Sequence, residues 1–317
     1  MKPICFVGID TSNYTTSAAV TDEAGKVIAN LKRPLQVSEG ERGLRQSDAV
    51  FSHVRNLPSL MDELSSVIAD RAVAAVGVSA KPRDAEDSYM PCFLSGIAAA
   101  HSFVAGLGAD VPIYEFSHQN GHLMAALYSS GAESLIGEEF LAFHVSGGTT
   151  EALLVSPSEH TFSPRLVGGT NDLNAGQAID RTGVMMGLHF PCGAEMEKLA
   201  LANEKEFPHL RTSVNGLFCN LSGIENMTSK LYAECGDRGI VSAATFDCIG
   251  RTLGKMSEEL RQKYGALPIV YAGGVMSNSI IQNMLSARKD TYFAKPAFSA
   301  DNAAGISLLC RRKHLGS

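Results

Sequence analysis

The sequence predicts an α/β protein of two similar subdomains around a nucleotide-binding cleft. Two stretches of the same design support this prediction, residues 7–20 and residues 143–155, and each stands at the front of one half of the 317-residue chain. In each, a strand enters, a turn of small and hydroxylated residues follows, and a second strand leaves. A repeat spaced at half the chain length indicates two subdomains of one fold. The expected subdomains are residues 1–135 and 136–317, with the last helix packing back on the first.

The second of these turns has the composition of a phosphate cradle. Gly147 and Gly148 lack Cβ atoms, so their backbone N–H groups can close on an anion, and the hydroxyls of Ser146, Thr149 and Thr150 add donors. The alternative is an ordinary tight hairpin, because Gly-Gly turns are common. Two such hairpins facing one cleft resemble the arrangement of the actin-like ATPase superfamily, which also contains sugar kinases and heat-shock chaperone ATPases.

Composition limits the classes of partner. The chain is 45% hydrophobic and 19% charged, as expected for a globular protein with a sizeable core. Its net charge of −6 implies no basic face, so a nucleic-acid partner would need a local patch or another protein. The seven scattered cysteines contain no Cys-x-x-Cys and are typical of reduced thiols in a cytoplasmic protein. No stretch approaches the length of a membrane span, so no membrane partner is expected.

The first half is expected to alternate between strands and helices. A polar loop containing Gly40 and Gly43 is expected at residues 36–48. The apolar patterns predict strands at residues 4–10, 16–21, 26–31, 73–78 and 111–116. They predict helices at residues 49–69, 92–107 and 123–128.

Two histidines four residues apart follow the strand expected at residues 111–116. Ser117 is a suitable N-cap, and on a helix His118 and His122 lie on one face, within reach of a single metal ion. Asp301, at the start of the C-terminal helix, is either a cap or an oxygen ligand to the same ion. The alternative for the pair is two histidines whose spacing has no function.

The second half is expected to hold the repeated hairpin and then mainly helices. A strand at residues 162–166 should continue the hairpin, residues 168–172 should turn, and residues 209–214 should form a further strand. Asp180, inside a helix, is either solvated or an acceptor for ligand hydroxyls. A second Gly-Gly turn, Gly273-Gly274, joins a strand to a helix start and is either a nucleotide site or a packing joint. The expected helices are at residues 174–186, 225–234 and 241–264, with others starting after residues 191, 278 and 301.

Seven stretches together resemble the TsaD/Gcp family, long called O-sialoglycoprotein endopeptidases and now understood as the catalytic subunit that makes threonylcarbamoyladenosine in tRNA. Residues 53–60 resemble its His-x-x-Asn-Leu-Pro-x-Leu, residues 118–122 its His-x-x-x-His, and residues 145–150 its phosphate hairpin. The other matches, to its Ala-Gly-Glu-Ala-Phe-Asp, Pro-Gly-Gly-Pro-x-x-Glu, Ala-Gly-Gly-Val-x-x-Asn and Asp-Asn stretches, lie at residues 175–180, 191–197, 272–278 and 301–302. The order and spacing of so many pieces are more specific than any one of them.

The resemblance implies transfer of a threonylcarbamoyl group from its adenylate to the amino group of the adenosine beside the anticodon of tRNA. One divalent metal, iron or zinc, would be held by His118, His122 and Asp301, with His144 where some members place a Tyr ligand. An adenine nucleotide, ATP or threonylcarbamoyl-AMP, would be held at its phosphates by Ser146, Gly147 and Gly148 and at its ribose and base by Asp180, Gly193, Glu197 and Asn278. The implied partners are tRNA and TsaB-like and TsaE-like subunits. No catalytic general base is identified.

Three departures from the family pattern indicate a diverged paralogue. The family opens Glu-Thr-Ser-Cys-Asp-Glu-Thr, and here Tyr14 and Thr15 replace the acidic pair linked to transfer. The Gly-Pro-Gly loop is replaced around residues 81–84, and the Lys of Ser-Gly-Leu-Lys-Thr becomes Glu225.

Three functions therefore remain open: the family's transfer to tRNA, a transferase or ATPase of the same fold with another acceptor, and a non-catalytic nucleotide-binding partner subunit. Intact metal ligands argue against the third. A protease is disfavoured, because the His-x-x-x-His lacks the Glu that metalloproteases place between the histidines as general base.

Overall fold

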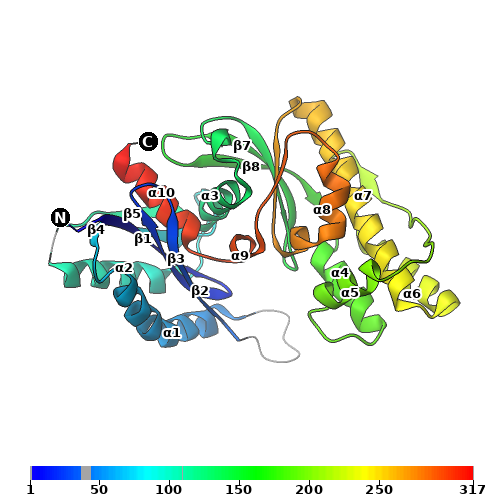
Figure 1. Cartoon of the computed structure of the whole chain (residues 1–317), viewed down its shortest axis with the longest axis horizontal. Helices are drawn as coiled ribbons and strands as arrows, with labels where there is room; N and C mark the ends of the chain where they lie inside the picture. The colour runs from blue at the N-terminus through cyan, green and yellow to red at the C-terminus, as the bar shows by residue number, and fades with distance from the viewer. Residues whose placement is uncertain (1, 37–43, 109, 317) are drawn as a thin grey trace. The chain divides into compact units, whose positions relative to one another are not determined.

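The computed structural model describes residues 2–36, 44–108 and 110–316, and the chain forms two compact units (Figure 1). The first unit contains the described residues of Met1–Tyr128, Pro157–Ser163 and Ala300–Ser317, and the second those of Ser129–Ser156 and Pro164–Ser299. Residues 37–43 of the loop expected at residues 36–48 lie outside the described residues. Over the part of the chain that is described, the structure has no helix long and apolar enough to cross a membrane.

The first unit is built on a five-stranded sheet of order β3-β2-β1-β4-β5. β1 pairs antiparallel with β2, which pairs antiparallel with β3, while β4 lies parallel to both β1 and β5. The strands are β1 (Ile4–Ser12), β2 (Thr15–Asp22), β3 (Val27–Pro34), β4 (Ala72–Lys81) and β5 (Ile113–Ser117).

Side-chain alternation along β1 gives its sheet two different faces. Cys5, Val7 and Ile9 pack in a core with α1 (Gln46–Val67) and α2 (Phe93–Leu107). On the opposite face lies Gly8, in register with Gly77 of β4. A Cβ on either glycine would press into the C-terminal helix α10 (Ala304–Leu315), so the missing side chains let that helix lie close on the sheet. Figure 1 shows α10, in red, beside the blue N-terminal strands.

The second unit contains a seven-stranded sheet of order β12-β11-β6-β7-β8-β10-β9. Its strands are β6 (Phe140–Val145), β7 (Thr150–Pro157), β8 (Phe162–Thr170), β9 (Val214–Asn215), β10 (Phe218–Cys219), β11 (Ile269–Ala272) and β12 (Thr291–Phe293). α3 (His118–Ser130) belongs mainly to the first unit. The helical elements of the second unit are η1 (Glu133–Leu135), α4 (Ala175–Met185), α5 (Gly193–Leu201), α6 (Gly223–Cys235), α7 (Arg238–Tyr264), η2 (Gly274–Ser277), α8 (Ser279–Ser286) and α9 (Pro296–Ser299).

The two sheets repeat one topology. Read from β8, the order β8-β7-β6-β11-β12 matches β3-β2-β1-β4-β5, and β6 pairs antiparallel with β7 but parallel with β11. The repeat expected from the sequence is therefore present in the structure.

Two local expectations were wrong. Gly168 and Gly169 do not turn but continue β8, because their missing Cβ atoms leave room for the backbone of Leu217 and Thr150, and the N–H of Gly169 donates to the carbonyl of Leu217. The strand expected at residues 209–214 is reduced to β9, which starts at Val214.

Candidate metal centre and nucleotide site

His118, His122 and Asp301 bring three donor atoms together in the first unit. The two Nε2 atoms lie 2.9 Å apart, and Oδ1 of Asp301 lies 3.6 Å from Nε2 of His118 and 3.3 Å from Nε2 of His122. Donors that share one ion at about 2.1 Å, with angles between octahedral and tetrahedral, lie about 3.0–3.4 Å from each other. The observed separations of 2.9, 3.3 and 3.6 Å lie within about 0.2 Å of this range, so the three side chains suit one divalent metal ion, and imidazole with carboxylate suits iron or zinc.

Asp10 orients His118 from the side opposite this group. Its Oδ1 lies 2.9 Å from Nδ1 of His118 and also accepts from the hydroxyl of Ser79, and the carboxylate is fully buried at the end of β1. With Nδ1–H donated to Asp10, the lone pair on Nε2 of His118 is directed toward His122 and Asp301. A carboxylate behind a histidine in this way is a common support for a metal ligand.

These charges strongly shift the ionisation of the metal-free group. Burial alone would lower the pKa of His118, but the charge of Asp10 and hydrogen bonds to Asp10 and Asp301 raise it to about 10. Burial alone would raise the pKa of Asp301, but hydrogen bonds and the charges of His118 and His122 hold it well below its usual value. These pKa shifts favour a proton held among the three side chains, which a bound metal ion would displace.

Two helix starts position the candidate ligands. The Ser117 hydroxyl accepts from the N–H of Asn120, so Ser117 caps α3 as expected and His118 is its first residue. Just before α10, the side chain of Asn302 accepts from the N–H of Ala304, the first residue of the helix, and Asp301 faces the histidines.

The two helices touch at a pair of glycines. A Cβ on Gly305 would overlap the carbonyl group of Gly121, and a Cβ on Gly121 would lie 2.8 Å from Cδ1 of Ile306. The backbones of α3 and α10 thus approach closely beside the candidate metal ligands.

His144, the fourth expected ligand, belongs to the second unit. It lies on β6, in register with Ala272 of β11 and Glu151 of β7. The ligand group found among the described residues consists of His118, His122 and Asp301 alone. Metal binding by His144 therefore stays a prediction.

The Ser146-Gly147-Gly148 turn is held by hydrogen bonds within the turn and to α4, and the space beside its two glycines is open. The Ser146 hydroxyl accepts from the N–H groups of Gly148 and Thr149 at 3.2 and 3.1 Å, and the Ser146 carbonyl accepts from the N–H of Gly176 in α4. A Cβ on Gly147 or Gly148 would meet no described atom within 4 Å. Neither residue has a positive φ, so neither conformation nor packing requires glycine here. The open space suits a ligand such as phosphate.

The second Gly-Gly turn lies beside the first. β11 runs parallel to β6, and a Cβ on Gly273 would overlap the carbonyl of Val145, the residue before Ser146. Gly273 also has a φ of 101°, which strongly favours glycine. Both turns therefore lie together at the carboxyl ends of β6 and β11. A Cβ on Gly274 would meet no atom of the described residues within 4 Å.

Asp180 and Gly193 lie together near the start of α5. Oδ1 of Asp180 accepts from the N–H of Cys192 at 2.8 Å, and burial raises the pKa of this carboxyl despite that bond. Among the described atoms, a Cβ on Gly193 would come within 4 Å of Cγ2 of Ile179 alone, at 4.0 Å. The second carboxylate oxygen of Asp180 and the open space at Gly193 thus lie beside the same segment, the loop between α4 and α5.

Glu197 and Asn278 both cap α8. Oε1 of Glu197 accepts from the N–H and hydroxyl of Ser279 at 2.7 and 2.6 Å, and Oδ1 of Asn278 accepts from the N–H of Ile281 at 3.0 Å. Each of the two residues thus stabilises the start of α8. Their predicted contacts with ribose and base could use only the remaining carboxylate oxygen and the amide NH₂.

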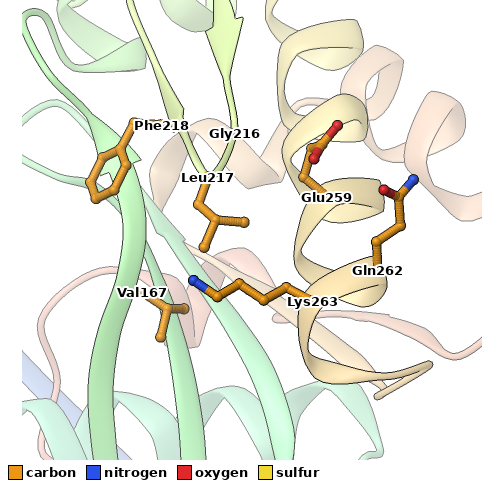
Figure 2. A pocket seen from close by; sticks show the side chains of 7 residues that line it. All are labelled: Val167, Gly216, Leu217, Phe218, Glu259, Gln262 and Lys263. Atoms are coloured by element: carbon orange, nitrogen blue, oxygen red, sulfur yellow. The ribbon is translucent and has the colours of Figure 1, made fainter.

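A separate cavity of about 550 Å³ contains none of the predicted site residues. It lies between β8, the β9–β10 turn and α7, and Figure 2 shows Val167, Leu217 and Lys263 among its lining side chains.

Asp10 is a residue of the site that was not predicted from the sequence. An acidic residue near the end of an apolar strand was a pattern in the sequence that could have indicated Asp10. Its partner His118 lies 108 positions away, so the contact between them could not be predicted from local sequence.

Comparison with known proteins supports both fold and family. A tRNA N6-adenosine threonylcarbamoyltransferase of Thermus thermophilus is 27% identical over 321 residues, covering 99% of this chain and 93% of the relative. One of Streptococcus sanguinis is 29% identical over 301 residues, covering 90% and 84%. A solved ROK family glucokinase from Streptomyces griseus, in complex with glucose and AMPPNP, has a TM-score of 0.55 at 12% identity and covers 96% of this chain and 98% of that one.

The expected actin-like ATPase fold is thereby confirmed, since a sugar kinase shares it over nearly the whole length. A sequence profile of the TsaD family, described as tRNA N6-adenosine threonylcarbamoyltransferase, matches residues 26–308. Because that match covers most of the chain, this protein belongs to the TsaD family of transferases.

Proposed function

We propose that this protein transfers a threonylcarbamoyl group from threonylcarbamoyl-adenylate to the amino group of the adenosine beside the anticodon of tRNA, and that the transfer depends on a divalent metal. The family match supports the reaction class. The observation that supports metal dependence is the triangle of donor atoms from His118, His122 and Asp301, backed by Asp10.

Asp10 and Ser79 keep His118 in the tautomer that presents Nε2, and Asp301 is held as a carboxylate by the two histidines. A metal bound to these three residues would supply a Lewis acid that polarises the carbonyl of the transferred group.

Residues of the second unit would hold the nucleotide. Phosphate would occupy the open space at Gly147 and Gly148 and bind backbone N–H donors of this turn, and the N–H of Gly148 would exchange its bond to the Ser146 hydroxyl for one to phosphate. The carboxylate oxygen of Asp180 that does not bond Cys192 would accept from a ribose hydroxyl, and the space at Gly193 would admit the sugar. Glu197 and Asn278 would contribute their uncommitted polar atoms to ribose and base.

Protein subunits are expected to assist. The net charge of −6 gives little attraction for tRNA, so part of the positive field would come from partners, which we infer to be TsaB-like and TsaE-like. Phe51 and Val54 are both exposed on one face of α1, which supports a protein contact there. Six of the seven free cysteines are buried, in keeping with the reducing cytoplasm as the location.

A second candidate is transfer to an acceptor other than tRNA. Thr15, which replaces one acid of the family pair, is buried, and a Thr hydroxyl is a poor base. Glu225, which replaces a Lys, pairs with Arg181 and cancels its charge. We therefore expect low activity of the isolated chain on bulk tRNA.

The experiment uses threonylcarbamoyl-adenylate labelled in its threonyl group, unmodified tRNA and the candidate partner subunits. Label should enter tRNA with the wild type and with Cys235→Ser, an exposed control, but not with His118→Ala/His122→Ala. Label in a different acceptor and not in tRNA would favour the second candidate. Equal transfer by the double variant would refute metal dependence at this site.

A further inference from the structure

The loop that follows β4 packs against the first turn of α3, which carries His118. The carbonyl of Pro82 in this loop accepts from the N–H of Gln119 at a distance of 3.0 Å. The first N–H groups of a helix have no partner inside the helix, so a bond from outside fixes the position of that turn. This loop is the one in which residues 81–84 replace the family's Gly-Pro-Gly.

Asp84 of the same loop holds two side chains of that turn. Its Oδ2 accepts from the hydroxyl of Ser117 at 2.9 Å and from Nδ2 of Asn120 at 2.6 Å. Both partners are buried. Ser117 immediately precedes His118, and Asn120 lies midway between His118 and His122. One carboxylate oxygen thus fixes the helix on both sides of the first histidine.

Ser117 connects Asp84 to the backbone of α3. Its hydroxyl donates to Asp84 and accepts from the N–H of Asn120 at 3.3 Å. Because the hydroxyl proton is directed at Asp84, the oxygen keeps its lone pairs for the helix, as a cap requires. Nζ of Lys81 lies 3.1 Å from Oδ1 of Asp84, so both carboxylate oxygens have partners. The ligand group found among the described residues does not include Asp84, so its contacts reach the histidines only through the helix.

We propose that Asp84 is a positioning residue of the metal centre, because it fixes the first turn of α3 and, through it, His118 and His122. The inference rests on the proposed function, since it concerns the same metal ion. Asp10 orients the ring of His118, whereas Asp84 fixes the backbone that carries both rings. Loss of contacts behind metal ligands weakens metal binding about 10- to 100-fold, and because Asp84 acts through the helix we expect about 10-fold.

The test measures the affinity of the purified full chain for Zn²⁺ by competition with a chelating dye. Asp84→Ala removes the acceptor shared by Ser117 and Asn120 and should weaken Zn²⁺ binding about 10-fold. Asp84→Asn keeps an acceptor oxygen in the same place and should restore most of the affinity. The matched control is Asp87→Ala, which removes an equal charge at an exposed position in the same loop and should bind Zn²⁺ as the wild type does.

A second measurement separates positioning from stability. The visible absorption of Co²⁺ bound in place of Zn²⁺ reports the arrangement of its ligands. The spectrum should change in Asp84→Ala and should match that of the wild type in Asp84→Asn and Asp87→Ala. A merely structural role would lower the urea midpoint of metal-free Asp84→Ala and leave both the spectrum and the Zn²⁺ affinity unchanged.

Equal Zn²⁺ affinity and equal Co²⁺ spectra in the wild type and Asp84→Ala would overturn the inference and leave the proposed function intact. Equal weakening in Asp87→Ala, or no recovery in Asp84→Asn, would also overturn it, because loss of charge would then explain the effect. Absence of Zn²⁺ binding by the wild type would instead refute the metal dependence of the proposed function, and the role of Asp84 with it.

Discussion

Replacing Gly305 by alanine should damage the metal centre without touching a ligand. The added Cβ would overlap the carbonyl of Gly121 and lie 3.0 Å from the N atom of Ala125, both in the backbone of α3. A side-chain rotation cannot relieve such a contact, so α3 and α10 must separate by on the order of 1 Å. Overpacking of this kind costs about 1–3 kcal/mol or more in the free energy of unfolding. The same movement would lengthen the distances of 3.6 and 3.3 Å from Asp301 to His118 and His122.

The assay combines elemental analysis of purified protein with urea unfolding. Gly305→Ala should lose most of its metal and unfold at lower urea concentration. Gly106→Ala is the matched control, since it lies in α2 of the same unit and its Cβ would meet none of the atoms that the structure describes within 4 Å. It should keep its metal and gain about 0.5–1 kcal/mol, the usual helix preference of Ala over Gly. Wild-type metal content and stability in Gly305→Ala would refute the close-approach argument.

Three further predictions concern the second unit and the thiols. Gly147→Val should abolish ATP or AMP binding in calorimetric titration while leaving the unfolding curve unchanged, because its side chain would fill open space; unchanged affinity would reject the phosphate cradle. Burial of Asp172 tends to raise its pKa, but hydrogen bonds from Ser222 and the N–H of Leu221 lower it below its usual value. A lowered folded-state pKa stabilises above the unfolded value of about 3.9, so the stability difference between wild type and Asp172→Asn should be full above about pH 4 and shrink below it; a pH-independent difference would contradict this. In native protein a thiol reagent should modify Cys235 first, because Cys235 is exposed. Burial raises the pKa of the thiols of Cys5, Cys92 and Cys219 to about 11, so these thiols should react slowly. Rapid modification of several thiols would contradict this and show that the core opens readily.

Local patterns in the sequence predicted most of the fold. The repeated strand–turn–strand stretches became β1–β2 and β6–β7 because alternating apolar residues and small turn residues specify a hairpin locally. Gly168 and Gly169 were misread as a turn for the same local reason. Whether a Gly-Gly pair turns or continues a strand depends on what lies beside it, here the backbone of Leu217 and Thr150.

The candidate site was predictable only where its residues are close in sequence or match a motif. The spacing of His118 and His122 placed both on one helix face, and the resemblance supplied Asp301. Asp10 and the Gly121–Gly305 contact depend on segments far apart in the chain, which no periodicity relates. Likewise, the capping of α8 by Glu197 could not be read from residues 82 positions apart.

Elemental analysis of wild type and His118→Ala/His122→Ala, both purified without chelator, tests directly whether these histidines bind a metal ion. We expect about one iron or zinc ion per chain in the wild type. We expect little metal in the double variant, with an unchanged circular dichroism spectrum. Equal metal content in the two proteins, or no metal in either after supply of both ions, would contradict a metal centre built from His118, His122 and Asp301.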